Sequence, residues 1–264
     1  MPKKRTSSAT DRTEVNARVA EKITPASELP QRARILLYGR SGRRKTRTAA
    51  TAPDVLLIDV NEEGTDSVRS DLDPDVFRVY YWSEILDVYW YLHSGDHAYK
   101  SFALDGLTGM QNLCMKFVLG DEASRDASRD PDMPSRTVWG KVGELMKTQI
   151  INFRNLPMNG IFTALERTKT SGEEDLDEQP YTSPNLSPSI ATSAEAAVGM
   201  IGYMVYREVV VKKGGKRTRV KRSRMMLGDS ERYLTKDRYG LGLDYVDSPN
   251  ITKLIERIYE GKEL

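Results

Sequence analysis

Short apolar segments alternate with helix-like segments from residue 33 onward, and this alternation constrains the fold more than any other feature of the chain. Five segments are typical of strands that are buried on both faces. They are residues 34–38, 54–59, 77–82, 101–105 and 159–165. Parallel neighbouring strands need long crossover connections, which the helix-like segments supply. The alternation therefore predicts an α/β fold with a mostly parallel central sheet flanked by helices.

Three of the helix-like segments have marked ends or faces. In residues 83–95 the apolar side chains recur at helical spacing, and Ser83 is expected to cap the first turn. Residues 136–153 carry a second apolar stripe of this kind. Near the C-terminus, Ser248 is expected to cap a last helix, with Pro249 at its first position. We expect each of these helices to turn its apolar face toward the sheet.

The pattern changes between residues 200 and 227. Two β-rich segments lie on either side of Gly214 and Gly215, which is typical of a β-hairpin. The sheet is therefore predicted to carry a C-terminal antiparallel β-hairpin extension.

The first 32 residues differ from the rest of the chain. They are rich in Ser, Thr, Lys, Arg and Glu and contain few large apolar residues. Such a segment cannot offset the entropy that it loses on ordering. We therefore expect a disordered basic and polar tail over residues 1–32 and a single domain over residues 33–264.

Composition excludes several classes of protein. Cys114 is the only cysteine, and the two histidines, His93 and His97, lie together in a polar stretch. A disulfide framework and a Cys/His zinc cluster within one chain are excluded. A Ser/His/Asp hydrolase is poorly supported, because neither histidine lies in a recognisable catalytic setting. No apolar segment approaches the roughly 20 residues that cross a bilayer. We expect a cytoplasmic protein with no membrane partner.

Residues 39–46, GRSGRRKT, follow the first predicted strand and have the arrangement of a phosphate-binding loop, or P-loop. Such a loop directs backbone N–H groups at phosphate oxygens, adds a lysine for the β- and γ-phosphates, and ends in a hydroxyl for Mg²⁺. Gly39 and Gly42 suit the tight turn, while Lys45 and Thr46 supply the cation and the hydroxyl. The predicted nucleotide-binding residues are Gly39, Arg40, Ser41, Gly42, Arg43, Arg44, Lys45 and Thr46.

Arg44 departs from the P-loop pattern, which has glycine at this position. The left-handed backbone conformation, which glycine adopts freely, costs a residue with a Cβ about 1–2 kcal/mol. That cost is tolerable. Two alternatives remain open for the side chain: it adds favourable charge to a polyphosphate, or it folds over the pocket and blocks it.

Carboxylates follow two of the predicted strands. Asp105 ends the strand over residues 101–105, where a nucleoside triphosphatase holds Mg²⁺, so Thr46 and Asp105 are the predicted metal-binding residues. Asp59, Glu62 and Glu63 lie at or just beyond the end of the second strand. Ligands of open α/β sheets bind at this edge. One of these side chains is expected to polarise the attacking water.

The segments GRSGRRKT, IDVNEEGT, FALDGLTGMQ, LPMNGIFTALERT and LTKDRYGLGL occur in the order seen in RecA-like ATPases. The chain resembles this family, especially the phage-encoded recombinases of single-strand annealing, over about residues 33–255. The resemblance implies a RecA-like P-loop NTPase core, with ATP and Mg²⁺ as cofactors. Glu63 matches the glutamate that orients water, although one extra residue precedes it and Glu62 remains a rival. Leu165 and Glu166 stand where relatives often carry a polar sensor of the γ-phosphate.

The segment KDRYG is similar to the KNRFG stretch of RadA-type relatives. In those relatives the lysine and the arginine reach the γ-phosphate in the neighbouring subunit. The resemblance implies these catalytic roles for Lys236 and Arg238, and with them a homo-oligomer, either a ring or a filament. The alternative is an ordinary charged turn. A single-strand-binding protein is a further partner that the resemblance implies.

Eight cations without an acidic residue lie between residues 212 and 224 on the predicted hairpin. Such a ribbon binds polyanions in a salt-sensitive, sequence-independent way. A solvated charged face is the alternative. The predicted DNA-binding residues are Lys212, Lys213, Lys216, Arg217, Arg219, Lys221, Arg222 and Arg224.

Together with the resemblance, the sequence predicts an ATP-binding RecA-like protein that acts on single-stranded DNA in phage-type recombination, annealing or repair. The protein is expected to be a DNA-dependent ATPase that binds ATP at its subunit interfaces. Two alternatives remain. One is a non-catalytic DNA-binding or scaffold protein whose P-loop has degenerated, as Arg44 and Leu165 indicate. The other is a helicase-type motor or loader of the same superfamily.

Overall fold

The computed structural model describes residues 9–60, 64–125, 133–169, 180–213 and 216–260. The chain divides into two units, residues 1–31 and residues 32–264. In the first unit, helix α1 spans Ala9–Ala20 and a 3₁₀ turn spans Ala26–Glu28. The prediction of disorder throughout residues 1–32 does not match this helix. Every α1 side chain whose burial the structure describes is exposed, so local helix propensity rather than burial accounts for it.

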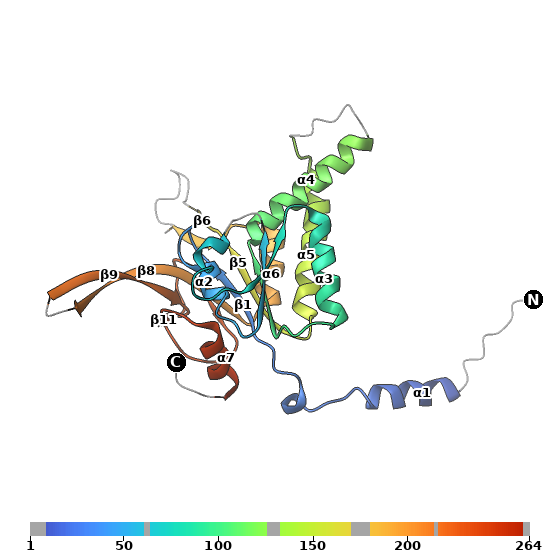
Figure 1. The fold of residues 1–264 in the computed structure, drawn as a ribbon. Coiled ribbons are helices and arrows are strands. Elements are labelled where there is room, and N and C mark those ends of the chain that lie inside the picture. The colour runs from blue at the N-terminus through green and yellow to red at the C-terminus, as the bar shows by residue number, and fades with distance from the viewer. Residues whose placement is uncertain (1–8, 61–63, 126–132, 170–179, 214–215, 261–264) are drawn as a thin grey trace, which may run out of the picture. The chain divides into compact units, whose positions relative to one another are not determined.

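Residues 32–264 are built around one large sheet (Figure 1). The strands that run parallel to one another lie in the order β3, β2, β4, β5, β1 and β8, and β9 and β11 continue the sheet as antiparallel strands. Their bounds are β1 Arg34–Tyr38, β2 Val55–Val60, β3 Asp75–Val79, β4 Ser101–Asp105, β5 Asn159–Ala164, β8 Met200–Lys213, β9 Lys216–Met226 and β11 Tyr245–Asp247. The predicted α/β fold with a mostly parallel sheet is confirmed.

Two small pairings complete the β-structure. Strand β10 (Lys236–Asp237) pairs antiparallel with the start of β8, and β6 (Glu166–Lys169) pairs with β7 (Tyr181–Pro184) in a separate two-stranded sheet. The helices are α2 Lys45–Ala49, α3 Trp82–Ser94, α4 Leu107–Arg125, α5 Arg136–Asn155, α6 Pro188–Ala197 and α7 Ile251–Glu260. None of the helices in the described part of the chain has the length and apolarity to span a membrane.

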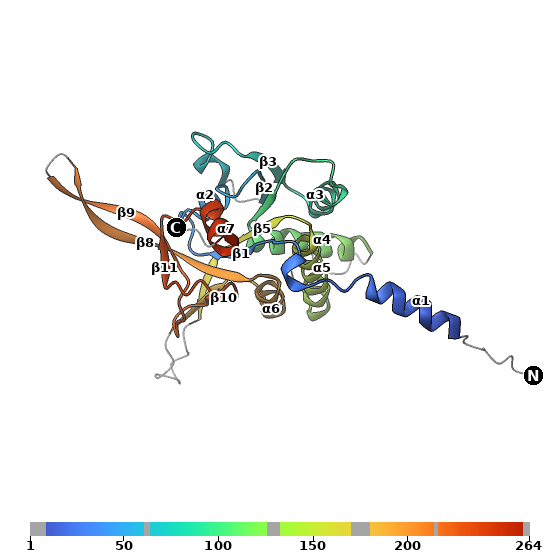
Figure 2. The same cartoon turned by 90° about the horizontal axis from the view of Figure 1, so that it is seen from below.

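Helices cover both faces of the sheet, as Figures 1 and 2 show. Alternate residues of β1 point to opposite faces. Leu36 and Tyr38 pack with α3, α4, α5 and α6 in one core cluster, whereas Ile35 and Leu37 pack with α2 and α7 in the other. Because β1 is buried on both sides, the loop that follows it leaves from a rigid position.

Strand β3 corrects one sequence prediction. The segment over residues 77–82 was expected to be a strand buried on both faces, but β3 ends at Val79 and most of its residues are exposed or half-buried. It lies at the edge of the sheet, so only one side chain, Val79, is fully packed. Trp82 already belongs to α3.

Two predicted helix caps are also wrong. Helix α3 begins at Trp82 with Tyr81 as its N-cap residue, so Ser83 lies within the first turn, and the carboxylate of Glu84 accepts hydrogen bonds from the N–H groups of Tyr80 and Tyr81 at 2.6 and 2.9 Å. At the start of α7, the Asn250 side chain accepts from the Lys253 N–H at 3.0 Å. Helix α7 begins after Asn250, so Ser248 and Pro249 precede it rather than cap it.

The hairpin of β8 and β9 is paired from Tyr203 and Met226 to its outer end, as predicted. Met204 and Met225 are fully buried at its base, and the strands continue outward from them. We call the part beyond this pair, residues 205–213 and 216–224, the arm. Figures 1 and 2 show the arm projecting away from the helices and the rest of the sheet.

Candidate nucleotide site

The P-loop joins β1 to α2 and lies against β8. The Gly39 N–H donates to the carbonyl of Ala164 at the end of β5, at 3.3 Å. Gly39 has a φ of 155°, and a Cβ on this residue would lie 2.6 Å from the carbonyl oxygen of Met204. Only glycine therefore allows β8 to approach the loop so closely.

Arg44 adopts the left-handed conformation that the glycine position of a P-loop requires. Its φ is 64° and its ψ is 25°. The side chain is exposed, and it lines a pocket of about 490 Å³ together with Lys45, Thr46 and Gly64. Because the pocket beside the exposed Arg44 is open, the blocking alternative does not describe this structure.

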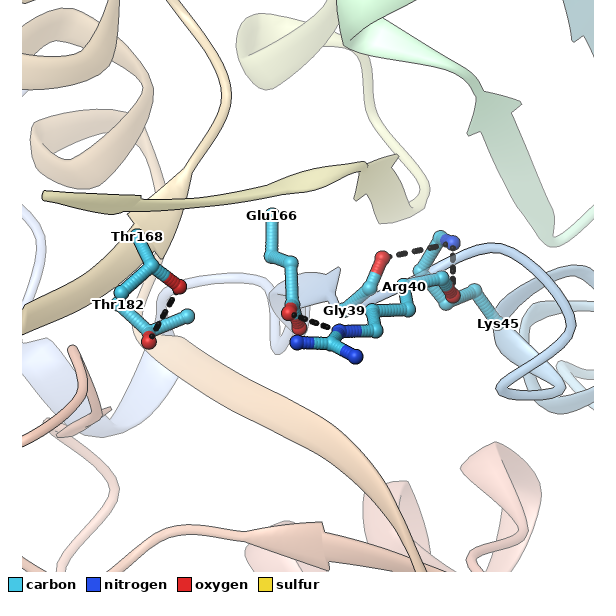
Figure 3. Close-up of polar contacts among 6 residues, drawn as sticks. All are labelled: Gly39, Arg40, Lys45, Glu166, Thr168 and Thr182. Atoms are coloured by element: carbon cyan, nitrogen blue, oxygen red, sulfur yellow. Dashed lines mark hydrogen bonds and ion pairs between the residues drawn. The ribbon is translucent and has the colours of Figure 1, made fainter.

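Lys45 is buried at the base of the loop. Its ammonium donates to the carbonyl oxygens of Gly39 and Arg40, at 3.0 and 3.1 Å, which Figure 3 shows. Both acceptors are neutral main-chain groups. Phosphate oxygens form stronger charge-assisted bonds with an ammonium, so they can compete for it.

Asp105 ends β4 and is fully buried beside the P-loop. Its two carboxylate oxygens accept hydrogen bonds from the hydroxyls of Thr46 and Thr163, each at 2.6 Å. Burial raises the pKa of Asp105, while these two hydrogen bonds and the charge of Lys45 oppose the rise. A carboxylate and a hydroxyl are oxygen ligands of the kind that Mg²⁺ prefers. The pair predicted from the sequence is thus brought together and fits a magnesium ion.

The chain returns to this pair after β2. A Cβ on Gly64 would lie 2.6 Å from Thr46 Oγ1 and 3.1 Å from Asp105 Oδ2, so Gly64 packs directly against both side chains. Glu62 and Glu63 precede Gly64 and lie outside the described residues. Asp59, at the end of β2, is buried and pairs in register with Asp105.

Sequence reasoning missed three contacts in and around the P-loop. The first is Thr163, the polar residue within β5 that binds Asp105. The second is an ion pair in which Arg40 Nε lies 2.9 Å from Glu166 on β6, next to the Thr168 and Thr182 hydroxyls that link β6 to β7 (Figure 3). Thr163 could have been found as the polar residue in the otherwise apolar strand segment IFTA. No local sequence pattern indicates that Glu166 is the partner of Arg40.

The third missed contact comes from Tyr206 on β8. Its hydroxyl donates to the carbonyl oxygen of Gly42 at 2.8 Å, and the Arg43 guanidinium lies 5.1 Å from the centre of its ring. Tyr206 also lines the pocket. The first residues of the arm therefore form part of the candidate nucleotide site.

Lys236 and Arg238 lie at the other end of the sheet. Lys236 pairs with Ile201 near the start of β8, and the Arg238 N–H donates to the Gly199 carbonyl at 2.8 Å. The Lys236 ammonium donates to the carbonyls of Glu195 and, at 2.8 Å, Val198, where α6 ends. Burial lowers the pKa of Lys236. Within one chain these side chains are separate from the P-loop, and Lys236 caps α6.

The arm cations divide into exposed and buried side chains. Arg217, Arg219, Lys221 and Arg222 are exposed. The side chains of Lys212, Lys213 and Lys216 lie outside the described residues. Arg224 is buried and forms a bidentate ion pair with Asp247, at 2.7 and 2.8 Å, with its guanidinium 3.5 Å from the ring centre of Tyr245. The Arg224 guanidinium thus holds β11 to β9 and is less accessible to a nucleic acid than the exposed arm cations.

The family model of the AAA domain matches residues 31–239, a region that contains the P-loop, Asp105 and the whole arm. The chain belongs to the AAA domain family. With the P-loop geometry, this membership makes residues 31–239 a P-loop ATPase-type domain.

Among solved structures, the chain is similar to that of a KaiC-like protein, PH0186, from the hyperthermophilic archaeon Pyrococcus horikoshii OT3. The two are 11% identical with a TM-score of 0.39, and the similarity covers 74% of this chain and 77% of the other. No curated protein matches the chain. Strand β11 and helix α7 follow the region that the family model matches.

Proposed function

We propose that this AAA domain binds ATP with Mg²⁺ in the P-loop pocket and hydrolyses it. The observation that carries the proposal is the Thr46–Asp105 pair, because a hydroxyl and a buried carboxylate meet at 2.6 Å beside the P-loop lysine. Thr46 and Asp105 would hold the metal, and Lys45 would bind phosphate oxygens. Mg²⁺, when bound, would neutralise charge that develops on those oxygens.

Glu63, with Glu62 as its rival, is proposed to orient the attacking water. The support comes from the next residue, since Gly64 packs against Thr46 and Asp105. The general base of a hydrolytic site must be within hydrogen-bond reach of the water, directly or through one further water. Glu63 directly precedes Gly64 in the chain, whereas Asp59 is buried within β2.

Lys236 and Arg238 are proposed to act on a neighbouring copy of the chain in a ring or a filament. They lie at the opposite end of the sheet from the P-loop of their own chain, so they can reach only the pocket of another subunit. A cation supplied in this way stabilises negative charge in phosphoryl transfer. Arg238 is the better of the two for this role, because it is exposed while Lys236 is bound to carbonyls of α6.

The exposed arm cations are proposed to bind single-stranded DNA. Arg217, Arg219 and Lys221 alternate along β9, so their side chains share one face. Arg222 lies on the other face, opposite Arg207. The cellular role that we propose is pairing or annealing of single strands in phage-type recombination or repair, and this role rests on the motif resemblance. A single-strand-binding protein as a partner and a cytoplasmic location belong to the same proposal.

Mg²⁺-dependent ATP hydrolysis, with and without single-stranded DNA, tests this function. Lys45→Ala is expected to abolish turnover because it removes the buried ammonium that is proposed to bind the phosphate oxygens. Lys100→Ala is the matched control, since Lys100 is exposed and pairs with Asp54. Turnover that is unchanged in Lys45→Ala would refute the proposal.

A non-catalytic scaffold is the second candidate, and the strained Arg44 favours it. The two candidates make different predictions for Arg44→Gly. A scaffold with a disabled loop would show no turnover in the native chain, and the glycine variant would gain it. A working ATPase would show turnover in both.

A further inference from the structure

Strand β8 touches the P-loop at two points. The first is the close approach of Met204 to Gly39, where a Cβ on the glycine would meet the Met204 carbonyl at 2.6 Å. The second is the hydrogen bond from Tyr206 to the Gly42 carbonyl at 2.8 Å. The two contacts come from residues two apart on one strand. Strand β8 thus contacts both glycines of the P-loop, Gly39 through Met204 and Gly42 through Tyr206.

Tyr206 fixes one peptide of the loop in a particular orientation. Its hydroxyl holds the carbonyl of Gly42, and on the same peptide the N–H of Arg43 donates to the Arg40 carbonyl at 3.3 Å. The Arg43 guanidinium lies over the Tyr206 ring. A change in the position of β8 would therefore turn this peptide and shift the backbone next to Arg44 and Lys45.

The face of the arm that carries Tyr206 also carries cations. Tyr206 is opposite Ser223, Glu208 is opposite Lys221, and farther out Arg219 and Arg217 follow on the same side of β9. At about 3.4 Å per residue, Lys221 is about 7 Å and Arg217 about 20 Å along the strand from the level of Tyr206. A polyanion bound along this face would thus lie on a continuous two-stranded ribbon that begins at the nucleotide pocket.

We propose that Tyr206 couples the two sites, so that a nucleic acid strand on the arm and a nucleotide in the P-loop strengthen each other's binding. This inference rests on the proposed function, because it takes the P-loop as a nucleotide site and the arm as a polyanion site. A strand bound to the arm restricts its motion, and Tyr206 transmits that restriction to the Gly42–Arg43 peptide. The entropy of ordering the loop is then already paid when the nucleotide binds.

The coupling must be reciprocal. The factor by which a nucleic acid strand raises nucleotide affinity equals the factor by which the nucleotide raises strand affinity. Repulsion between the two bound anions acts in the opposite direction, but the Debye length is about 8 Å at physiological ionic strength, so most of the arm is screened from the pocket. The ordering of the loop is therefore expected to outweigh the electrostatic repulsion, with a coupling factor of about five or more.

The test measures two dissociation constants in the full chain at fixed salt. One is that of a nonhydrolysable ATP analogue with and without saturating oligodeoxythymidine, and the other is that of fluorescent oligodeoxythymidine with and without the saturating analogue. The native chain is expected to give equal coupling factors above one. Tyr206→Ala is expected to bring both factors to about one while the affinity for the oligonucleotide alone stays the same, since the arm cations remain.

Two further variants control for folding and for the loss of a hydroxyl. Tyr206→Phe keeps the ring under Arg43 and loses only the hydrogen bond to Gly42, so its factor is expected to lie between those of the native chain and Tyr206→Ala. Tyr81→Phe, at an exposed position before α3, is expected to keep the native factor.

The outcomes separate this inference from the function on which it rests. If the native chain binds both ligands with factors of one or below, or if Tyr206→Ala keeps the native factors, the coupling through Tyr206 is refuted while the proposed function stands. If the native chain binds neither ligand, the proposed function and the coupling are both refuted.

Discussion

The P-loop and the arm both carry positive charge, but they hold it in different ways. At the P-loop, the ammonium of Lys45 is buried and its bonds to the Gly39 and Arg40 carbonyls fix its position. On the arm, Arg217 and Arg219 are exposed on a two-stranded ribbon. A buried charge acts at one point with defined geometry, whereas exposed charges act together and are screened by salt. Substitutions should therefore have large, local effects in the first region and graded effects in the second.

The largest effect is expected from Asp105→Asn. This change removes the charged ligand of the proposed magnesium site, and we expect Mg²⁺-dependent ATP turnover to fall by at least about 100-fold, which is about 2.7 kcal/mol of transition-state stabilisation. Asp54→Asn is the matched control, because Asp54 is an exposed partner of Lys100. A variant that keeps more than a tenth of native turnover would contradict the assignment of Asp105.

The same variant has a defined pH signature. Burial raises the pKa of Asp105 in the folded chain, so folding favours the protonated form, and this contribution is present below the unfolded pKa and lost as the pH rises through the folded pKa. The ionised carboxylate then costs stability at neutral pH. Thermal melts should show Asp105→Asn to be at least as stable as the native chain at pH 7, with less advantage at pH 4.

On the arm, the triple variant Arg217→Ala, Arg219→Ala and Lys221→Ala should weaken oligonucleotide binding in a graded way. Loss of three phosphate contacts is expected to reduce the slope of log affinity against log salt by about 2. Fluorescence anisotropy at several salt concentrations measures this slope. Arg224→Ala is the internal control, because its ion pair with Asp247 makes it structural and its slope should stay native. Equal slopes in the native chain and the triple variant would show that this face does not bind the strand.

A smaller effect is expected at the root of the arm, where Arg224 holds Asp247. The Arg224 guanidinium lowers the pKa of Asp247, so the pair stabilises the fold above the ordinary pKa of the carboxyl, and this stabilisation is lost as the pH falls through the lowered value. Asp247 is partly exposed, so solvent limits the coupling to about 1 kcal/mol. A double-mutant cycle of Arg224→Ala and Asp247→Asn, measured by denaturant unfolding at pH 7 and at pH 3, should show a larger coupling energy at pH 7 than at pH 3.

The smallest effect is expected from Arg44→Gly. Relief of the left-handed strain stabilises the fold by about 1–2 kcal/mol, and the greater freedom of glycine in the unfolded chain offsets about 0.5–1 kcal/mol of it. The net gain should be about 0.5–1 kcal/mol in denaturant unfolding. A loss of stability would show that the Arg44 side chain makes contacts that outweigh its backbone strain.

How far the sequence could predict the molecule differs between the same two regions. The strand over residues 34–38 and the P-loop after it follow from local patterns, because a buried strand and the loop after it are coded by adjacent residues. The left-handed backbone at Arg44 could also be predicted, since the motif specifies that torsion. These features depend on little beyond their own segment.

Contacts between distant segments could not be predicted in this way. Tyr206 is 164 residues from Gly42, and Arg40 is 126 residues from Glu166, so only the folded sheet brings these side chains together. The ion pair of Arg224 could not be predicted for the same reason, because its partner Asp247 lies on another strand. A run of basic residues predicts positive charge, but burial determines which of those side chains is accessible to a ligand.

The central claim is that a P-loop with arginine at its last glycine position still binds a triphosphate. A crystal structure of the chain with Mg²⁺ and a nonhydrolysable ATP analogue tests it most directly. We predict phosphate density along residues 39–46, with the Lys45 ammonium moved from the Gly39 and Arg40 carbonyls to a phosphate oxygen. Density for the Arg44 guanidinium inside the pocket, with no nucleotide at saturating concentration, would contradict the account.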